Sequence, residues 1–244
     1  MYKNIAIQLW STQEDVSKGL LDVIKRMKDA GANGVELYAI PDIPAEEFAA
    51  TLDEMGMKIA SSHLGFDTLT KDLDATLAYF KPLGTKTLVC PGYHPADFAD
   101  MKRFAEEFSA AARKAKEHGV ELLYHNHSNE FTQLFDGVPY WIRLAEEYPD
   151  IGLQLDCFWA YNADFDPLEL LNKYPTRIKS LHLKNGFKGP DFTDLDNGAI
   201  NFEPLIKRAE ELGIEWSILE CEKSCEYTYT FCKNSVDYIK GLDK

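Results

Sequence analysis

A short apolar, β-prone segment followed by a helical segment occurs eight times along the 244 residues of this chain. We expect the eight strands at residues 5–10, 34–39, 58–65, 87–91, 120–127, 151–159, 178–184 and 215–221. Strict alternation of strand and helix predicts a parallel sheet, and eight units in this length favour closure over an open, doubly wound sheet. The sequence therefore predicts the α/β class, and within it a (β/α)8 TIM barrel that forms a single domain over residues 1–244.

Helix boundaries support this regular architecture. The first helix is expected after a capping-box pattern at Ser11 and Glu14 and should run for about 15 residues to Gly31. The remaining helices are expected near residues 45–55, 72–83, 98–118, 138–148, 167–174, 202–212 and 229–239. Five glycines share one slot, just past a helix and before a strand, where a left-handed residue ends a helix cleanly: Gly31, Gly56, Gly84, Gly119 and Gly213.

Charge and hydropathy restrict the partners of the chain. The formal net charge is −14, whereas nucleic-acid binding needs a basic face that displaces counterions from phosphates. No apolar run reaches the roughly 18 residues that a membrane span needs. The segment from Met1 to Ile5 also lacks the pattern of a signal peptide. We therefore expect a cytoplasmic protein that acts on a small-molecule carbohydrate and binds neither nucleic acid nor membrane. The sequence does not fix its oligomeric state, and a homo-oligomer is one of the options.

Polar side chains gather at the carboxyl ends of the predicted strands, the end of such a barrel that carries the chemistry. His125, Asp156, His182 and Glu220 follow four consecutive strands, and adjacent strands lie roughly 4.8 Å apart. A single Asp in such a place is often an N-cap, and a single His is often a core residue. Four convergent positions instead favour a site for one divalent metal ion. Mixed imidazole and carboxylate ligands suit Mn²⁺, Zn²⁺, Co²⁺ or Fe²⁺ better than Ca²⁺.

Further residues at the same strand ends are candidates for binding a substrate. They are Trp10, Glu36, Tyr93, His94, His127 and Trp159. The aromatic members can stack on sugar faces or simply fill the barrel mouth, and Glu36 can anchor substrate or pair with a neighbouring charge. All six arginines map to helices or to the opposite end of the barrel. A neutral sugar is therefore favoured over a sugar phosphate, because arginine is a common phosphate ligand.

Four motifs resemble the xylose isomerase-like sugar isomerase/epimerase superfamily. They are Tyr-His-Asn-His-x-x-Glu-Phe at 124–131, Gln-Leu-Asp-x-x-Trp at 154–159, Arg-Ile-x-x-Leu-His-Leu-Lys at 177–184 and Asn-Gly-Ala-Ile-Asn-Phe at 197–202. The resemblance implies a divalent metal, often manganese, with ligands matching His125, Asp156, His182 and Glu220. This chain departs from the common pattern of the family at three positions. It has His125 where many members have Glu, Trp159 where others have His, and Asn185 where Asp is commoner. The first of these argues against epimerisation by two glutamates.

The predicted activity is a metal-dependent sugar isomerase or epimerase that works through an enediolate, with the cation acting as a Lewis acid. The candidate bases are Glu220, His63 and Lys184, in that order. The alternative is a lyase that expels an oxygen β to the carbanion of a 3-keto-glycoside. Two less favoured interpretations are an apurinic endonuclease-like phosphodiesterase and a non-catalytic sugar-binding barrel.

Overall fold

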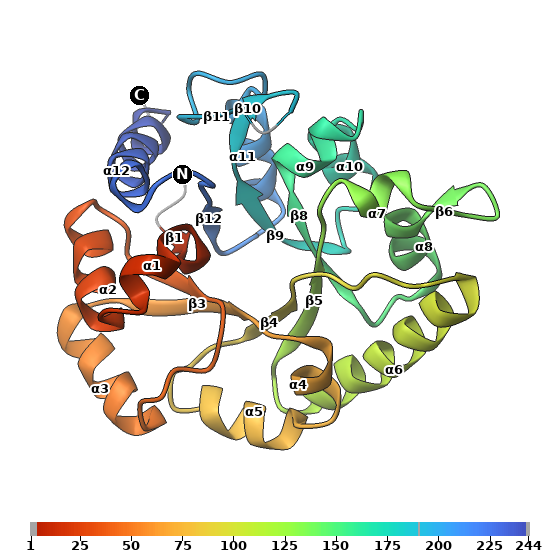
Figure 1. The fold of residues 1–244 in the computed structure, drawn as a ribbon, viewed down its shortest axis with the longest axis horizontal. Helices are drawn as coiled ribbons and strands as arrows, with labels where there is room; N and C mark the ends of the chain where they lie inside the picture. Colours follow the sequence, from red (N-terminus) through yellow and green to blue (C-terminus); the bar gives the residue numbers. More distant parts are fainter. Residues whose placement is uncertain (1–3, 190, 243–244) are drawn as a thin grey trace.

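Eight parallel strands close into a barrel in a computed structural model that describes residues 4–189 and 191–242 (Figure 1). The predicted domain extends beyond the described residues at positions 1–3, 190 and 243–244. Most of the Met1–Ile5 segment, in which no signal-peptide pattern was found, also lies outside them. Hydrogen bonds run around the ring in the order β1-β12-β9-β8-β5-β4-β3-β2 and back to β1. The strands are β1 Ile5–Gln8, β2 Gly34–Leu37, β3 Lys58–His63, β4 Thr87–Cys90, β5 Glu121–His125, β8 Gly152–Asp156, β9 Ile178–Leu183 and β12 Ser217–Leu219. The predicted barrel is confirmed.

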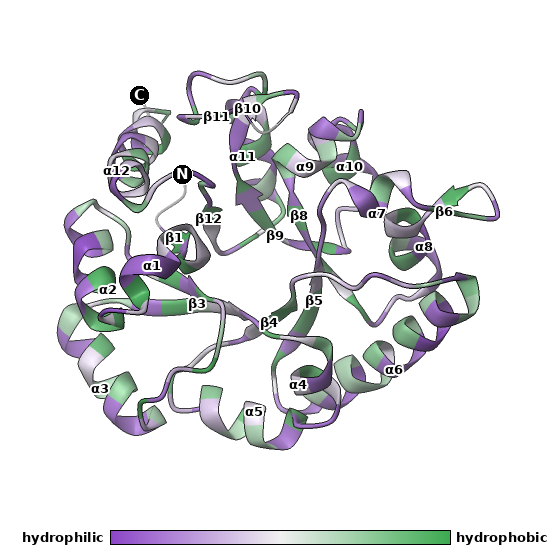
Figure 2. Cartoon of the chain, in the orientation of Figure 1, coloured by the Kyte–Doolittle hydropathy of each residue, from purple (hydrophilic) through white to green (hydrophobic). Residues whose placement is uncertain are grey.

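A ring of helices surrounds the strands (Figure 1). Those that follow the eight strands as predicted are α2 Leu20–Asp29, α3 Ala45–Met55, α5 Leu73–Phe80, α6 Phe98–Glu117, α8 Tyr140–Glu147, α10 Pro167–Lys173, α11 Phe202–Glu211 and α12 Cys225–Gly241. Figure 2 shows their alternating hydrophobic and hydrophilic stripes, and the apolar residues of these stripes are buried against the strands. All five predicted glycines have positive φ, between 65° and 102°. Within the described residues, no helix is both long and apolar enough to cross a membrane.

Short elements at the carboxyl ends of the strands were not predicted. They are the 3-10 helix η1 Leu9–Thr12, helices α1 Gln13–Val16, α4 Phe66–Thr70, α7 Asn129–Thr132 and α9 Cys157–Asn162, and the hairpins β6 Leu134–Phe135 with β7 Val138–Pro139 and β10 Asn185–Phe187 with β11 Asp191–Thr193. The predicted capping box is wrong. The Ser11 hydroxyl accepts a hydrogen bond from the backbone N–H of Cys221 at 3.1 Å, so it joins the two ends of the chain instead of capping a helix.

Two irregularities in strand register lie inside the barrel. The pairing of β2 with β3 shifts between Val35 and Glu36, and the pairing of β8 with β9 shifts between Leu153 and Gln154. A bulge of this kind changes the direction of the side chain that follows it, and bulges are common beside active sites. Glu36 and Gln154 are both completely buried, and they meet beneath the predicted site.

Candidate active site

The four predicted metal ligands converge at the carboxyl ends of their strands. His125 and Asp156 end β5 and β8, His182 lies near the end of β9, and Glu220 follows β12 directly. All four side chains are buried, and each offers a ligand atom that lies within 4.8 Å of those of the others. Strand register explains the convergence, since Asp156 is paired with His182 and His182 with Ile218, two residues before Glu220.

The carboxylate of Asp156 has one oxygen that the protein leaves without a hydrogen bond. Its Oδ1 accepts from the backbone N–H of Trp159 at 2.8 Å and caps α9. Its Oδ2 is buried without a hydrogen-bond partner, 3.3 Å from Lys184 Nζ and 4.0 Å from His182 Nδ1. A buried carboxylate oxygen is costly unless it is paired or bound to a metal. Asp156 Oδ2, the Glu220 carboxylate and the imidazoles of His125 and His182 therefore fit a divalent cation.

His182 lies between two carboxylates. Its Nδ1 is 2.8 Å from Glu220 Oε2, and its Nε2 is 2.6 Å from Glu36 Oε1. Burial alone would lower the pKa of His182, but Glu36 and Glu220 raise it to about 10. Nδ1 faces Asp156 and Glu220, so it is the nitrogen that would bind a cation together with them, while Nε2–H donates to Glu36.

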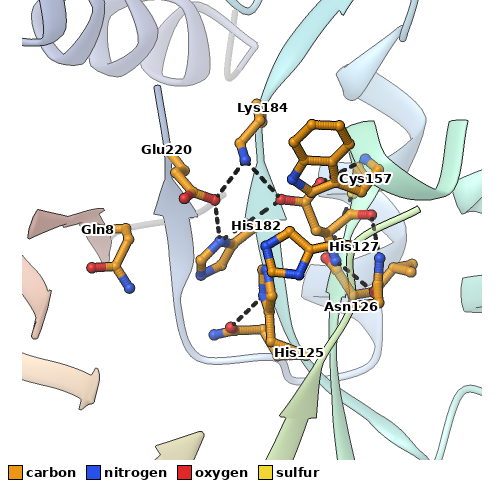
Figure 3. A network of polar contacts seen from close by, with 12 residues as sticks. Gln8, His125, Asn126, His127, Cys157, His182, Lys184 and Glu220 are labelled. Carbon is orange, nitrogen blue, oxygen red and sulfur yellow. Dashed lines mark hydrogen bonds and ion pairs between the residues drawn. The ribbon is translucent and has the colours of Figure 1, made fainter. Parts of the chain in front are cut away.

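The Lys184 ammonium lies next to Glu220 (Figure 3) and contacts three carboxylates. Its Nζ is 3.3 Å from Asp156 Oδ2, 2.9 Å from Glu220 Oε2 and 2.6 Å from Glu222 Oε1, and it lies 5.0 Å from the centre of the Trp159 ring. Burial alone would lower the pKa of Lys184, but the three carboxylates raise it above its ordinary value. Lys184 is therefore a protonated ammonium group in this arrangement, and its role as a candidate base stays a prediction.

Glu36 does not reach the barrel mouth, contrary to the prediction that it binds substrate. Its side chain has no exposed surface, and both oxygens already accept hydrogen bonds. Although burial alone would raise the pKa of Glu36, His63 and His182 hold it well below its ordinary value. Glu36 is thus an ionised carboxylate beneath His182, with no oxygen left for a substrate.

His63 and His125 share one acceptor. The Oε1 of Gln154 lies 2.7 Å from His63 Nε2 and 3.0 Å from His125 Nδ1, and Glu36 Oε1 is 3.1 Å from His63 Nε2. The Gln154 amide nitrogen donates to Glu36 Oε2 at 2.7 Å, which leaves Oε1 as the acceptor for both rings. Burial and then His182 lower the pKa of His125 well below its ordinary value, so this ring is neutral and carries its proton on Nδ1.

The remaining predicted residues lie around the mouth with different partners. Trp10 is 49% exposed and packs edge-on against Tyr38, with 5.5 Å between the ring centres. The His127 ring contacts the His125 and Trp159 rings, with centres 5.1 Å and 5.9 Å away. His127 and Trp159 therefore lie beside the four-residue group, whereas the contact shown for Trp10 is with Tyr38.

Tyr93 and His94 lie farther out on the rim. The Tyr93 hydroxyl donates to Asp100 Oδ1 at 3.0 Å and accepts from Arg103 at 2.9 Å, and His94 Nδ1 is 3.2 Å from Asn129 Nδ2. Arg103 thus reaches the rim from α6, contrary to the prediction that all arginines lie away from the reactive end. Its guanidinium is paired with Asp100 and Glu107, so its charge is already balanced within the protein.

Several residues of the site were missed because they lie one layer deeper than the strand ends. Gln154, Ser180 and Ser61 precede Asp156, His182 and His63 by two residues, so they face the barrel interior directly below them. Gln154 Nε2 donates to Ser180 Oγ at 3.2 Å, and Ser61 Oγ donates to Glu36 Oε2. Polar residues spaced by two within an otherwise apolar strand were the available signal.

Comparison with known proteins agrees with this geometry. Residues 24–242 match the family model described as a xylose isomerase-like TIM barrel. The chain belongs to this family. Like other xylose isomerase-like TIM barrels, it is an enzyme, and its family membership confirms the resemblance carried by the four motifs.

Individual relatives in the family differ in the names of their activities. An inosose dehydratase from Clostridium beijerinckii is 26% identical over 63% of this chain and 58% of that protein. One from Geobacillus kaustophilus is 23% identical over 90% of this chain and 86% of that protein. The solved structure of a sugar phosphate isomerase/epimerase from Parabacteroides distasonis has a TM-score of 0.84 at 23% identity and covers 98% of this chain and 94% of its own. At this identity the solved structure is evidence for the fold alone.

Proposed function

We propose that this chain is a divalent-metal-dependent lyase that breaks the carbon–oxygen bond β to a carbonyl group in a keto-polyol or a 3-keto-glycoside. The observation that carries the proposal is the position of Lys184, an ammonium group in contact with two of the four ligand carboxylates. An elimination needs a proton donor for the departing oxygen, and Lys184 is a cationic donor placed where substrate would meet the metal. The inosose dehydratases among the sequence relatives are named for a reaction of this class.

The metal would be held by His125, Asp156, His182 and Glu220, whose two nitrogen and two oxygen donors suit Mn²⁺, Zn²⁺, Co²⁺ or Fe²⁺. A bound divalent cation supplies Lewis-acid stabilisation for negative charge that develops on a substrate oxygen. If Asp156 and Glu220 held a cation, the Lys184 ammonium would keep its hydrogen bond to Glu222 and would have N–H groups to offer to a substrate oxygen. We propose Mn²⁺ as the resident ion.

His63 is the proposed base. Its Nε2–H donates to Gln154 and lies beside ionised Glu36, so Nδ1 carries the lone pair. Glu220, the first candidate from the sequence, already accepts hydrogen bonds from His182 and Lys184 and serves better as a ligand. In the proposed step His63 takes the proton from the carbon next to the carbonyl. The electron pair forms the carbon–carbon double bond, the β carbon–oxygen bond breaks, and the departing oxygen takes a proton from Lys184.

A second candidate is the isomerase or epimerase activity that the sequence predicts. The same base would remove the same proton, and the proton would return to a carbon while no carbon–oxygen bond breaks. A neutral substrate is proposed for both activities, because the one arginine found at the rim, Arg103, is already paired with acidic side chains.

The test is incubation of the Mn²⁺-loaded protein with keto-inositols, 3-keto-glycosides and free ketoses in D₂O, followed by NMR and absorbance. We expect release of water or of the aglycone, together with the absorbance of an unsaturated ketone. Deuterium at carbon without loss of a leaving group would replace the lyase by an isomerase or epimerase. No exchange and no conversion with any of these compounds would contradict both proposals.

A further inference from the structure

A buried carboxylate below the site connects to three of its histidines. Glu36 Oε1 lies 2.6 Å from His182 Nε2 and 3.1 Å from His63 Nε2. Glu36 Oε2 accepts from Gln154 Nε2 at 2.7 Å, and the same amide offers its oxygen to His125 at 3.0 Å. Glu36 has no exposed surface, yet it contacts His182 directly and His125 through the Gln154 amide, and these are the two imidazoles of the proposed metal site.

Such a carboxylate is costly to bury, so its position requires an explanation. Isolated buried charges are destabilising unless they are paired and hydrogen-bonded. Here Gln8 Nε2 at 2.6 Å and the Ser61 hydroxyl complete the shell of donors around Glu36. The register shifts of β2 and β8 fall immediately before Glu36 and Gln154, the two residues that contact the histidines. The barrel departs from regular pairing at the two points that bring these side chains beneath the site.

Among the described residues two overlapping groups could hold a metal ion. One is His125, Asp156, His182 and Glu220, and the other is His63, His125 and His182. The Nε2–H of His182 donates to Glu36 Oε1, and that of His63 donates to Gln154 Oε1 with Glu36 Oε1 3.1 Å away, so protons occupy both Nε2 atoms. The other nitrogen of His182, Nδ1, faces Asp156 and Glu220, and it is the one that would give up its proton to bind a cation with them. The hydrogen bonds therefore favour the four-residue group.

We propose that Glu36 is a positioning residue that fixes the proton positions of His182, His63 and, through Gln154, His125, and so selects the four-residue group as the metal site. This inference rests on the metal dependence in the proposed function. A metal-bound histidine often donates its second ring proton to a carboxylate. Removing that carboxylate typically weakens metal binding by about 10–100-fold. Glu36 would act on two ligands at once without touching the ion or the substrate.

The test compares Glu36→Gln with Glu130→Gln in the full-length protein. Glu130 is an equally buried glutamate at the same end of the barrel, but it accepts from Tyr124 and from the backbone of His127 and touches none of the four ligands. We expect Glu36→Gln to weaken Co²⁺ binding by roughly 10–100-fold in calorimetry and to change the visible spectrum of bound Co²⁺. Glu130→Gln should leave both unchanged. Equal Co²⁺ affinity and an equal spectrum in folded Glu36→Gln would overturn the inference.

A measurement on the unaltered protein covers the case in which Glu36→Gln does not fold. Nitrogen-15 NMR of the metal-free protein should show neutral His125 protonated on Nδ1 and the proton of His63 on Nε2. The opposite proton positions would refute the assignment to Glu36 and Gln154. Failure of the unaltered protein to bind Co²⁺ would instead remove the metal from the proposed function, so the two failures are distinguishable.

Discussion

Replacing Lys184 with Met is expected to lower the rate of leaving-group release by about 10²–10⁴-fold, the usual contribution of a positioned proton donor. Exchange of the substrate proton with D₂O should continue, because the proposed base, His63, does not contact Lys184. Release of the leaving group and deuterium incorporation are measured by NMR in the same sample. This result would separate removal of the proton from departure of the oxygen.

A matched control is Lys188→Met, which removes an exposed lysine that follows β10 and is paired with Asp164. This control should change neither rate by more than about twofold. Because Lys184→Met removes a positive charge from beside Asp156 and Glu220, Mn²⁺ affinity should be retained or should rise. Loss of exchange and release together, with Mn²⁺ still bound, would make Lys184 the base and would contradict its assignment as the proton donor.

Replacing Asp156 with Asn is expected to reduce Mn²⁺ affinity by more than the 10–100-fold typical of groups that only orient a ligand. The substitution removes the negative charge beside His182 and Lys184 but keeps an oxygen that can cap α9. Calorimetric titration with Mn²⁺ measures the loss of affinity, and thermal unfolding checks that the fold is intact. Turnover should fall together with metal binding.

Asp166→Asn provides the matched control for Asp156→Asn. Asp166 also caps a helix at this end of the barrel, with Oδ1 2.7 Å from the N–H of Leu168, but it is not among the groups that could hold a metal. The control should keep full Mn²⁺ affinity. Unchanged affinity in Asp156→Asn would show that the ion binds elsewhere and would contradict the assignment of the four ligands.

The barrel could be predicted from the sequence because its signals are repeated and long. Eight apolar segments alternate with helices, and glycines such as Gly56 and Gly213 end helices with the expected left-handed conformation. The short elements after the strands escaped prediction because four to six residues are too few to show a helical period. The first helix was predicted as one unit ending at Gly31, but the structure divides it into α1 Gln13–Val16 and α2 Leu20–Asp29. The role of Ser11 also escaped prediction, because its partner, Cys221, lies 210 residues away in the sequence.

The convergence of His125, Asp156, His182 and Glu220 could also be predicted, because consecutive strand ends must meet in a closed parallel barrel. How deep each side chain lies inside the barrel could not be predicted. Glu36 and His63 both lie near strand ends in the sequence, yet Glu36 is completely enclosed while His63 is 8% exposed. Glu36 is paired with Ser61, two residues before His63, so it lies one layer deeper, and a pattern of residue types carries no information about this register. Gln154 was missed because its partners come from four other strands.

The most direct test of the metal site is electron paramagnetic resonance of the metal-free protein titrated with Mn²⁺. Four ligands from β5, β8, β9 and β12 predict one tightly bound ion per chain, with nuclear coupling to two imidazole nitrogens. Absence of a bound ion, or a bound ion without nitrogen coupling, would contradict the account.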